Sequence, residues 1–300
     1  MSRGLVMKLR GPPEDRSIPE LLSFGVINID KPIGPSSHQI SAWVREVIEV
    51  DKTAHSGTLD PKVTGCLPIL LGDATRLSKI LLGKKEYVVI LELHEDGKKE
   101  IELNRVLEEF KGEIYQKPPK KSAVLRKLRI REIYDIELLE IKGRKALLRV
   151  ECESGTYIRK LCHDIGLVLG HGAHMGDLRR TKSYPFDDSE LTKLHELIDA
   201  MEIWKEEGNE ELIREIIHPG ELVLEGIPKI IISQTAAMQV AKGAPVYAPG
   251  IISSENEEIL TEGMEVVCYT QEGSAVCLGE FTGKIDSSKG KIVNLKRVLV

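Results

Sequence analysis

Apolar residues along the first two thirds of the chain follow both helical and strand spacing. From 38 to 50 they recur every three or four residues, and Ser36 or Ser37 can cap the start of that helix. Elsewhere, short apolar runs bounded by turn residues indicate buried strands. We therefore expect strands at 24–30, 66–71, 86–93, 130–141 and 145–152, and helices at 38–50, 74–82, 101–111, 157–170 and 190–217. Because these elements follow no regular βαβ order, the pattern predicts an α+β domain.

The pattern changes after about Gly226, where glycines separate short strand candidates at 229–232, 264–269 and 275–281. Short strands at such glycine spacing are typical of a small closed β domain. The first residues of the chain are polar and irregular, so we expect them to form an arm. The sequence thus predicts three parts, namely an N-terminal arm at 1–24, an α+β domain at 25–225 and a small β-barrel domain at 226–300.

Composition limits the class of protein. A chain of 300 residues usually exceeds one compact domain, and 41% hydrophobic residues suffice for two cores. No apolar run is long enough to cross a membrane, and the segment 1–16 lacks the apolar stretch of a secretory signal. The five cysteines include no Cys-x-x-Cys pair, which favours reduced intracellular thiols over a disulfide framework. We therefore expect a cytoplasmic protein without membrane contact.

The net charge of −5 argues by itself against a nucleic-acid partner, but the charges are unevenly distributed. Segment 117–131 is basic throughout and contains no acid, whereas segment 190–215 is strongly acidic. A second basic cluster consists of Arg179, Arg180 and Lys182. A run of like charge is often only a solvated face, so solvation and phosphate binding both remain open for segment 117–131.

The loop at 55–65 (HSGTLDPKVTG) places one acid, Asp60, among glycines, hydroxyl residues and a proline. An Asp before a Pro commonly starts a turn, because its side chain accepts backbone hydrogen bonds. A carboxylate presented by such a loop also suits a nucleophile or a base. Composition alone favours the turn, so other segments must decide between the two.

A metal site is the remaining chemical candidate in the sequence. Cysteine and histidine gather at Cys162, His163, His171 and His174. The adjacent side chains of Cys162 and His163 cannot easily converge on one ion, and the spacing matches no zinc motif. We therefore expect neither a metal nor another cofactor.

The Asp60 loop closely resembles the catalytic loop of the TruB/dyskerin family of RNA pseudouridine synthases. Three further segments resemble motifs of the same family in the same order, namely 28–37 (NIDKPIGPSS), 154–159 (SGTYIR) and 172–181 (GAHMGDLRRT). The C-terminal region, with AKGAPV at 241–246, resembles a PUA domain, a small RNA-binding module. The resemblance implies a mixed-sheet catalytic domain followed by a small β-barrel, and it favours a catalytic Asp60.

The family chemistry implies roles for three residues. Conversion of uridine to pseudouridine breaks the glycosidic bond and rejoins the uracil through carbon 5, so the nucleotide must leave the stack to be reached. The resemblance makes Asp60 the nucleophile or the base at the sugar. It pairs Arg159 with Asp60, which keeps the acid ionised, although a surface arginine or a partner of Glu151 or Glu153 is the plain alternative. It places Tyr157 beneath the base, where it can assist proton removal.

The same resemblance implies a set of substrate contacts. Tyr87 matches the tyrosine that stacks on the flipped base, Leu178 offers backbone groups to the uracil edge, and His55 positions the nucleotide. Lys31 belongs to the first motif, near the active site. For Tyr87 and Leu178 the plain alternative is an ordinary side chain of a buried strand.

Segment 117–131 resembles the mobile loop that closes over substrate RNA in this family. Its basic residues then become phosphate contacts, which depend on salt. The expected RNA contacts are Lys117, Lys120, Lys121, Arg126, Arg179 and Arg180 in the catalytic domain and Gly243 in the PUA domain.

Other details resemble the archaeal and eukaryotic dyskerin branch, including PSSH at 35–38 and WKEEG at 204–208. Members of that branch work in H/ACA ribonucleoproteins, where a guide RNA pairs with the substrate RNA and three small proteins assist. No lysine-rich tail follows Val300, so an archaeal subunit is expected. The alternatives are a stand-alone transfer-RNA enzyme and a non-catalytic RNA-binding scaffold of the same fold.

Overall fold

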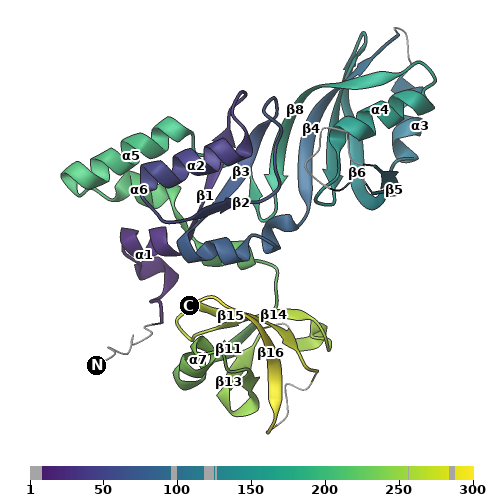
Figure 1. The fold of residues 1–300 in the computed structure, drawn as a ribbon. Helices are drawn as coiled ribbons and strands as arrows, with labels where there is room; N and C mark the ends of the chain where they lie inside the picture. The colour runs from purple at the N-terminus through teal and green to yellow at the C-terminus, as the bar shows by residue number, and fades with distance from the viewer. Residues whose placement is uncertain (1–8, 96–99, 118–124, 126, 256, 284–287) are drawn as a thin grey trace.

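The computed structural model describes residues 9–95, 100–117, 125, 127–255, 257–283 and 288–300, which form two β-sheets (Figure 1). The larger sheet contains β1 (Gly25–Lys31), β2 (Thr53–His55), β3 (Thr64–Leu71), β4 (Lys85–Leu93), β5 (Gly112–Gln116), β6 (Arg129–Lys142), β7 (Lys145–Cys152), β8 (Ala173–Ser183), β9 (Phe186–Asp187) and β10 (His218–Pro219). Its order is β10-β1-β3-β8-β4-β7-β6-β5, with β2 added beside β3 and β9 beside β8. Only the β3–β8 pair is parallel among the strands described in this sheet.

The smaller sheet contains β11 (Lys229–Ile232), β12 (Val246–Tyr247), β13 (Ile251–Ser254), β14 (Glu265–Tyr269), β15 (Ala275–Phe281) and β16 (Lys291–Val298). Its order is β12-β16-β15-β14-β11-β13, which combines antiparallel pairs with the parallel pair β11–β14. Both sheets are therefore mixed, and the smaller one forms a separate barrel-like lobe in Figure 1. The predicted α+β class with a small β domain is confirmed.

Helices flank the larger sheet at both ends. They are α1 (Ile18–Ser23), α2 (Ser37–Ile48), α3 (Glu100–Glu108), α4 (Ile158–Val168), α5 (Leu194–Glu207) and α6 (Glu211–Ile216), while α7 (Gln234–Ala241) belongs to the smaller lobe. In Figure 1, α2, α5 and α6 lie at one end of the sheet, and α3 and α4 lie at the other. Ser36 caps α2 as expected, because its hydroxyl accepts a hydrogen bond from the backbone of Gln39.

Two predicted helices have a different form. The expected helix at 74–82 is replaced by two short 3₁₀ segments, η2 (Gly72–Leu77) and η3 (Ile80–Leu82). The helical pattern at 190–217 divides into α5 and α6 at Gly208, whose φ of 71° is left-handed. A glycine in that conformation ends a helix without steric cost, which the periodicity of apolar residues does not reveal.

The two lobes share a hydrophobic core. Phe24, Leu70 and Leu224 from the larger lobe belong to the same buried cluster as Tyr269 and Leu299 from the smaller one. Burial of apolar surface from both sides holds the lobes together without requiring a specific bond. The smaller lobe is therefore fixed against the larger one.

The N-terminal segment is not the irregular arm that the sequence suggested. Residues 1–8 lie outside the described part of the chain, but Ile18 and Leu21 of α1 are buried in the main core. The guanidinium of the buried Arg16 donates to both carboxylate oxygens of Glu221, at 2.8 and 2.7 Å, and to the hydroxyl of Ser274 at 3.0 Å. Because Ser274 belongs to the smaller lobe, the segment joins the two lobes.

Candidate active site

Asp60 lies in the loop that joins β2 to β3, and buried side chains anchor that loop at several points. The hydroxyl of Ser37, at the start of α2, accepts a hydrogen bond from the backbone N–H of Leu59 at 2.8 Å. It also donates one to the carbonyl of Leu59 at 3.1 Å. The N–H of Val63 donates to the carbonyl of Asp60, which closes a turn. The position of Asp60 is thus set by the backbone on both sides of it.

Lys31 anchors the second half of the loop. Its side chain is fully buried, and its Nζ donates to the carbonyls of Pro32 at 2.9 Å, Pro61 at 3.3 Å and Val63 at 2.8 Å. Burial lowers the pKa of Lys31, and the charge of Asp60 acts in the opposite direction. The expected substrate contact of Lys31 is therefore wrong, because its three ammonium hydrogens are already used in hydrogen bonds to the loop and to the carbonyl of Pro32.

Arg180 anchors the first half of the loop. Only 1% of its surface is exposed. Its guanidinium donates to the carbonyls of Cys66 at 2.7 Å, Gly57 at 2.9 Å and Ser56 at 3.4 Å. A Cβ at Gly57, whose φ is +69°, would lie 3.0 Å from that guanidinium. The expected phosphate contact of Arg180 is wrong, because its donors face the protein interior.

Arg159 and Asp60 form an ion pair, as expected. Arg159 is the second residue of α4, and the side chains of the two partners are 52% and 53% exposed. The alternative acids are occupied elsewhere, since Glu151 contacts Lys84 and Glu153 contacts Arg131. At this exposure the pair adds less than about 1 kcal/mol to stability. Its consequence is geometric, because it orients a carboxylate that solvent and ligands can reach.

The two tyrosines expected at the site are held in different ways. Tyr87 lies on β4 opposite Arg180 of β8 and is only 9% exposed. Burial raises the pKa of its phenol, while the charge of Arg180 opposes the rise. Tyr157 precedes α4, and its backbone exchanges two hydrogen bonds, of 2.8 and 3.2 Å, with the side chain of Gln116. Tyr157 is thus held by a residue that the sequence did not point to, at the end of β5.

His55 is a neutral group in this setting. Burial lowers the pKa of His55 to about 4, and the neighbouring His38 and the charge of Arg180 act in the same direction. At neutral pH the ring is therefore the uncharged imidazole, which lacks the acidic imidazolium proton that a general acid would donate. A positioning role, as expected for His55, suits the ring better than acid–base catalysis.

The remaining predicted contacts differ in their exposure, and some lie outside the described residues. Leu178 is half-buried on β8, opposite Val89 of β4. Arg179 is half-exposed and contacts Asp30 at 3.0 Å and Asp188 at 3.6 Å, so two acids already offset its charge. Lys117 is exposed, whereas Lys120, Lys121 and Arg126 lie outside the described residues. Gly243 follows α7 with a φ of +96°, and a Cβ there would contact nothing within 4 Å.

The cysteine and histidine candidates lie apart from this site. Cys162 is buried in α4, His163 contacts Asp164, and His174 contacts His94 with a nitrogen–nitrogen distance of 3.1 Å. Within the described ranges, no group of three or more His, Cys, Asp or Glu side chains is arranged to hold a metal ion.

Lys85 is a buried cation that the sequence analysis missed. Its Nζ donates to the carbonyl of Leu81 at 2.6 Å and to that of Gly83 at 3.1 Å. Burial and the nearby charge of Arg180 lower the pKa of Lys85 to about 7. Lys85 lies two positions before Tyr87 on β4, and side chains at this spacing share a face of the sheet. The two-residue spacing between Lys85 and Tyr87 is the sequence signal that could have identified Lys85 as a residue near the site.

Family models match most of the chain. Residues 45–158 match the model of the TruB family pseudouridylate synthase N-terminal domain, and residues 159–225 match that of the tRNA pseudouridylate synthase B C-terminal domain. Residues 9–41 match the DKCLD (NUC011) domain, and residues 228–298 match the PUA domain.

Similar proteins cover the chain almost completely. A protein of Halobacterium salinarum named "Probable tRNA pseudouridine synthase B" is 53% identical over 303 residues, covering 98% of this chain and 100% of the relative. A chain of a crystallised Cbf5-Nop10-Gar1 complex is 44% identical with a TM-score of 0.90, covering 98% of this chain and 90% of that one. A chain of an H/ACA RNP bound to a substrate RNA containing 2'-deoxyuridine is 43% identical with a TM-score of 0.89, covering 97% and 90%.

The first prediction tests the role of Arg180. The substitution Arg180→Met leaves three buried carbonyls without their charged donor, so we expect the free energy of unfolding to fall by about 3 kcal/mol in urea denaturation. The matched control is Arg179→Met, which removes a half-exposed ion pair and costs less than about 1 kcal/mol. Equal effects of the two substitutions would contradict the anchoring role.

The second prediction concerns Lys85 and pH. Between pH 7 and the ordinary lysine value of 10.5, the unfolded chain binds a proton that the folded chain has released, so stability rises with pH. We expect the difference in unfolding free energy between wild type and Lys85→Met to shift by about 2 kcal/mol in favour of wild type from pH 7 to pH 9. Denaturant titrations at both pH values measure it, and a constant difference would show that Lys85 stays charged.

Proposed function

Because the chain belongs to the TruB family of pseudouridylate synthases, we propose that this pseudouridine synthase modifies selected uridines of RNA under the direction of an H/ACA guide RNA, with Asp60 as its catalytic acid residue. The observation that carries the catalytic assignment is the exposed ion pair of Asp60 and Arg159 on an anchored loop. A carboxylate that is oriented and open to solvent is the group that such a reaction requires.

The reaction needs the target nucleotide outside the RNA stack. Once flipped, its sugar or base can approach the exposed carboxylate of Asp60, which acts either as the nucleophile or as the base at the sugar. The guanidinium of Arg159 holds that carboxylate in one orientation and stabilises its charge. Tyr157, two residues before Arg159, is the proposed group beneath the base that assists loss of the proton from carbon 5.

The base itself is bound by residues around this pair. We assign stacking to the ring of Tyr87 and contact with the uracil edge to the backbone of Leu178. His55, neutral at physiological pH, positions the nucleotide without exchanging protons. Lys31 and Arg180 act only through the loop that they hold.

Support for a guided reaction comes from the similar structures. One of them contains Cbf5 with Nop10 and Gar1, and another is an H/ACA RNP bound to substrate RNA. The similarity to each covers nearly the whole of this chain at a TM-score of 0.89 or more. We therefore infer that this chain binds a guide RNA, a substrate RNA such as ribosomal RNA, and three small partner proteins.

A stand-alone reaction on transfer RNA is the second candidate. The relative from Halobacterium salinarum is named as a probable tRNA pseudouridine synthase B, and it matches this chain over its full length. The non-catalytic scaffold is disfavoured, since the chain has the Asp60–Arg159 ion pair and both tyrosines of the family motifs.

RNA contacts outside the pocket are assigned to Lys117, Lys120, Lys121, Arg126 and Arg179, and to Gly243 in the PUA domain. The exposed backbone at Gly243, with open space around its Cα, suits close approach of a nucleic-acid strand.

Each helix among the described residues is too short or too polar to span a bilayer. A cytoplasmic location is consistent with this finding, and we propose it.

The third prediction is the loss of catalysis in Asp60→Asn. Release of tritium from carbon-5-labelled uridine falls about a thousandfold or more, because the amide is neither a nucleophile nor a base, while RNA binding in a filter assay is kept. The matched control is Asp199→Asn, an exposed acid of α5, which leaves turnover unchanged. Substantial turnover by Asp60→Asn would remove Asp60 from the mechanism.

The fourth prediction separates the two substrates. With guide RNA and partner proteins present, a ribosomal RNA fragment complementary to the guide releases tritium, and omission of the guide abolishes the release. A transfer-RNA transcript is tested in parallel with the protein alone. Guide-independent turnover on transfer RNA, with none on the guided fragment, would establish the stand-alone enzyme.

A further inference from the structure

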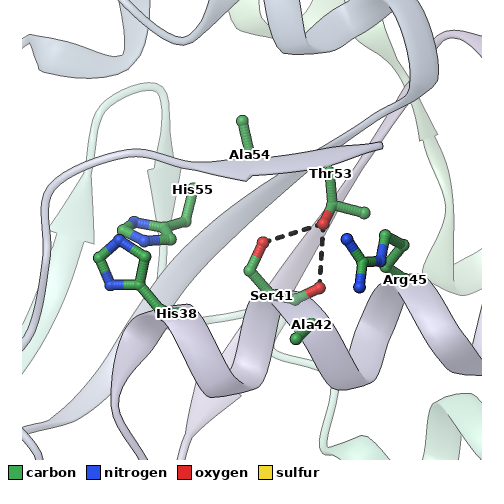
Figure 2. Close-up of a pocket in the computed structure, with 7 residues that line it drawn as sticks. All are labelled: His38, Ser41, Ala42, Arg45, Thr53, Ala54 and His55. Carbon is green, nitrogen blue, oxygen red and sulfur yellow. Dashed lines mark hydrogen bonds between the residues drawn. The ribbon is translucent and has the colours of Figure 1, made fainter. Parts of the chain in front are cut away.

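A pocket of about 390 Å³ opens between α2 and β2, beside the catalytic loop (Figure 2). None of the roles proposed above uses the pocket itself, although His55 forms part of its wall. Figure 2 shows His38 and His55 facing each other at one end and Arg45 at the other. The lining residues are His38, Ser41, Ala42, Arg45, Thr53, Ala54 and His55.

Hydrogen bonds between the side chain of Ser37 and the backbone of Leu59 link the pocket to the loop that carries Asp60. Ser37, which exchanges two hydrogen bonds with Leu59, is the residue immediately before His38. Leu59 is the residue immediately before Asp60. Helix α2, which forms one wall of the pocket, therefore contacts the catalytic loop through the residue before His38. That contact is made with the residue before Asp60.

The floor of the pocket is preformed. The hydroxyls of Ser41 and Thr53 lie 3.0 Å apart in a hydrogen bond, and the Thr53 hydroxyl also donates to the carbonyl of Ser41 at 2.9 Å (Figure 2). These bonds fix β2 against α2, so a ligand would not have to order the pocket. A preformed site loses less affinity to conformational entropy than a flexible one.

The two ends of the pocket offer different chemistry. The rings of His38 and His55 meet edge to face with centroids 4.8 Å apart, and the Nδ1 of His55 is buried without a hydrogen-bond partner. Arg45 is exposed and pairs with no carboxylate in the part of the chain that the structure describes, whereas Arg159, Arg179 and Arg214 all pair with one. Flat rings suit a nucleobase, and an unpaired guanidinium suits a phosphate.

We propose that this pocket holds a nucleotide directly adjacent to the target uridine, with its base against His38 and His55 and its phosphate against Arg45. The volume falls within the usual range for a small-molecule site, roughly 300–1,000 Å³, and is sufficient for one nucleotide. The proposal rests on the proposed function, since it assumes that the target uridine enters beside Asp60. It adds a second contact that holds the RNA while the target is flipped.

The experiment compares His38→Ala and Arg45→Ala with matched controls in the assembly that turns over in the fourth prediction. His195→Ala alters the second residue of α5, as His38 is the second residue of α2, and Arg105→Ala removes an exposed arginine of α3. We expect His38→Ala to raise KM about tenfold with little change in kcat, the effect of one lost base contact. For Arg45→Ala, the slope of log Kd against log salt falls by about 0.7.

Substrates with one abasic nucleotide distinguish the two neighbours of the target. When the abasic nucleotide is the neighbour that enters the pocket, KM rises about tenfold in wild type and rises no further in His38→Ala. When it is the other neighbour, the change in KM is the same in both proteins. Unchanged KM and salt slope in both variants would overturn the proposal. Wild type and Asp60→Asn are run beside them, because loss of turnover in wild type would instead implicate the proposed function.

Discussion

The site depends on two buried cations that bind backbone carbonyls of one loop. A buried charge costs several kcal/mol unless hydrogen bonds replace its water, and Arg180 and Lys31 find those bonds on the residues before and after Asp60. The loop carbonyls equally need these donors, because buried acceptors without partners are costly. Loop and cations therefore stabilise each other. Among the described residues, no carboxylate takes part in these anchoring bonds, so the side chain of Asp60 is available to pair with Arg159.

Rigid support is combined with an exposed ion pair in this way. The Asp60–Arg159 pair is half-exposed and contributes little to stability, so the loop is held by the buried anchors and not by this pair. Ser37 extends the same support to α2, and through α2 to the pocket at His38. A shared apolar core and the Arg16–Glu221 ion pair fix the PUA lobe to the catalytic lobe. RNA bound to the PUA domain would thus meet the active site at a defined separation.

Much of the fold could be predicted from the sequence, because local signals were consistent. The cap at Ser36, the strands β1, β3, β4, β6 and β7, and the helices α2, α3 and α4 follow from apolar spacing and turn residues. The segment at 72–82 was harder to predict, since 3₁₀ turns and an α-helix share their apolar spacing over so few residues. The N-terminal segment was misjudged because Arg16 is polar in sequence, and only its contacts with Glu221 and Ser274 make it a buried residue.

The sequence by itself determined the family, the acid at position 60 and its partner Arg159, because those residue types stand in a motif order that chance does not supply. Only the tertiary structure decided what the other cations do. Lys31, Lys85, Arg179 and Arg180 look alike as basic residues, yet three are buried and bind carbonyls while Arg179 pairs with acids near the surface. The physical reason is strand geometry, since neighbouring side chains such as Arg179 and Arg180 point to opposite faces of the sheet. Which face is buried depends on strands and loops that are distant in the sequence.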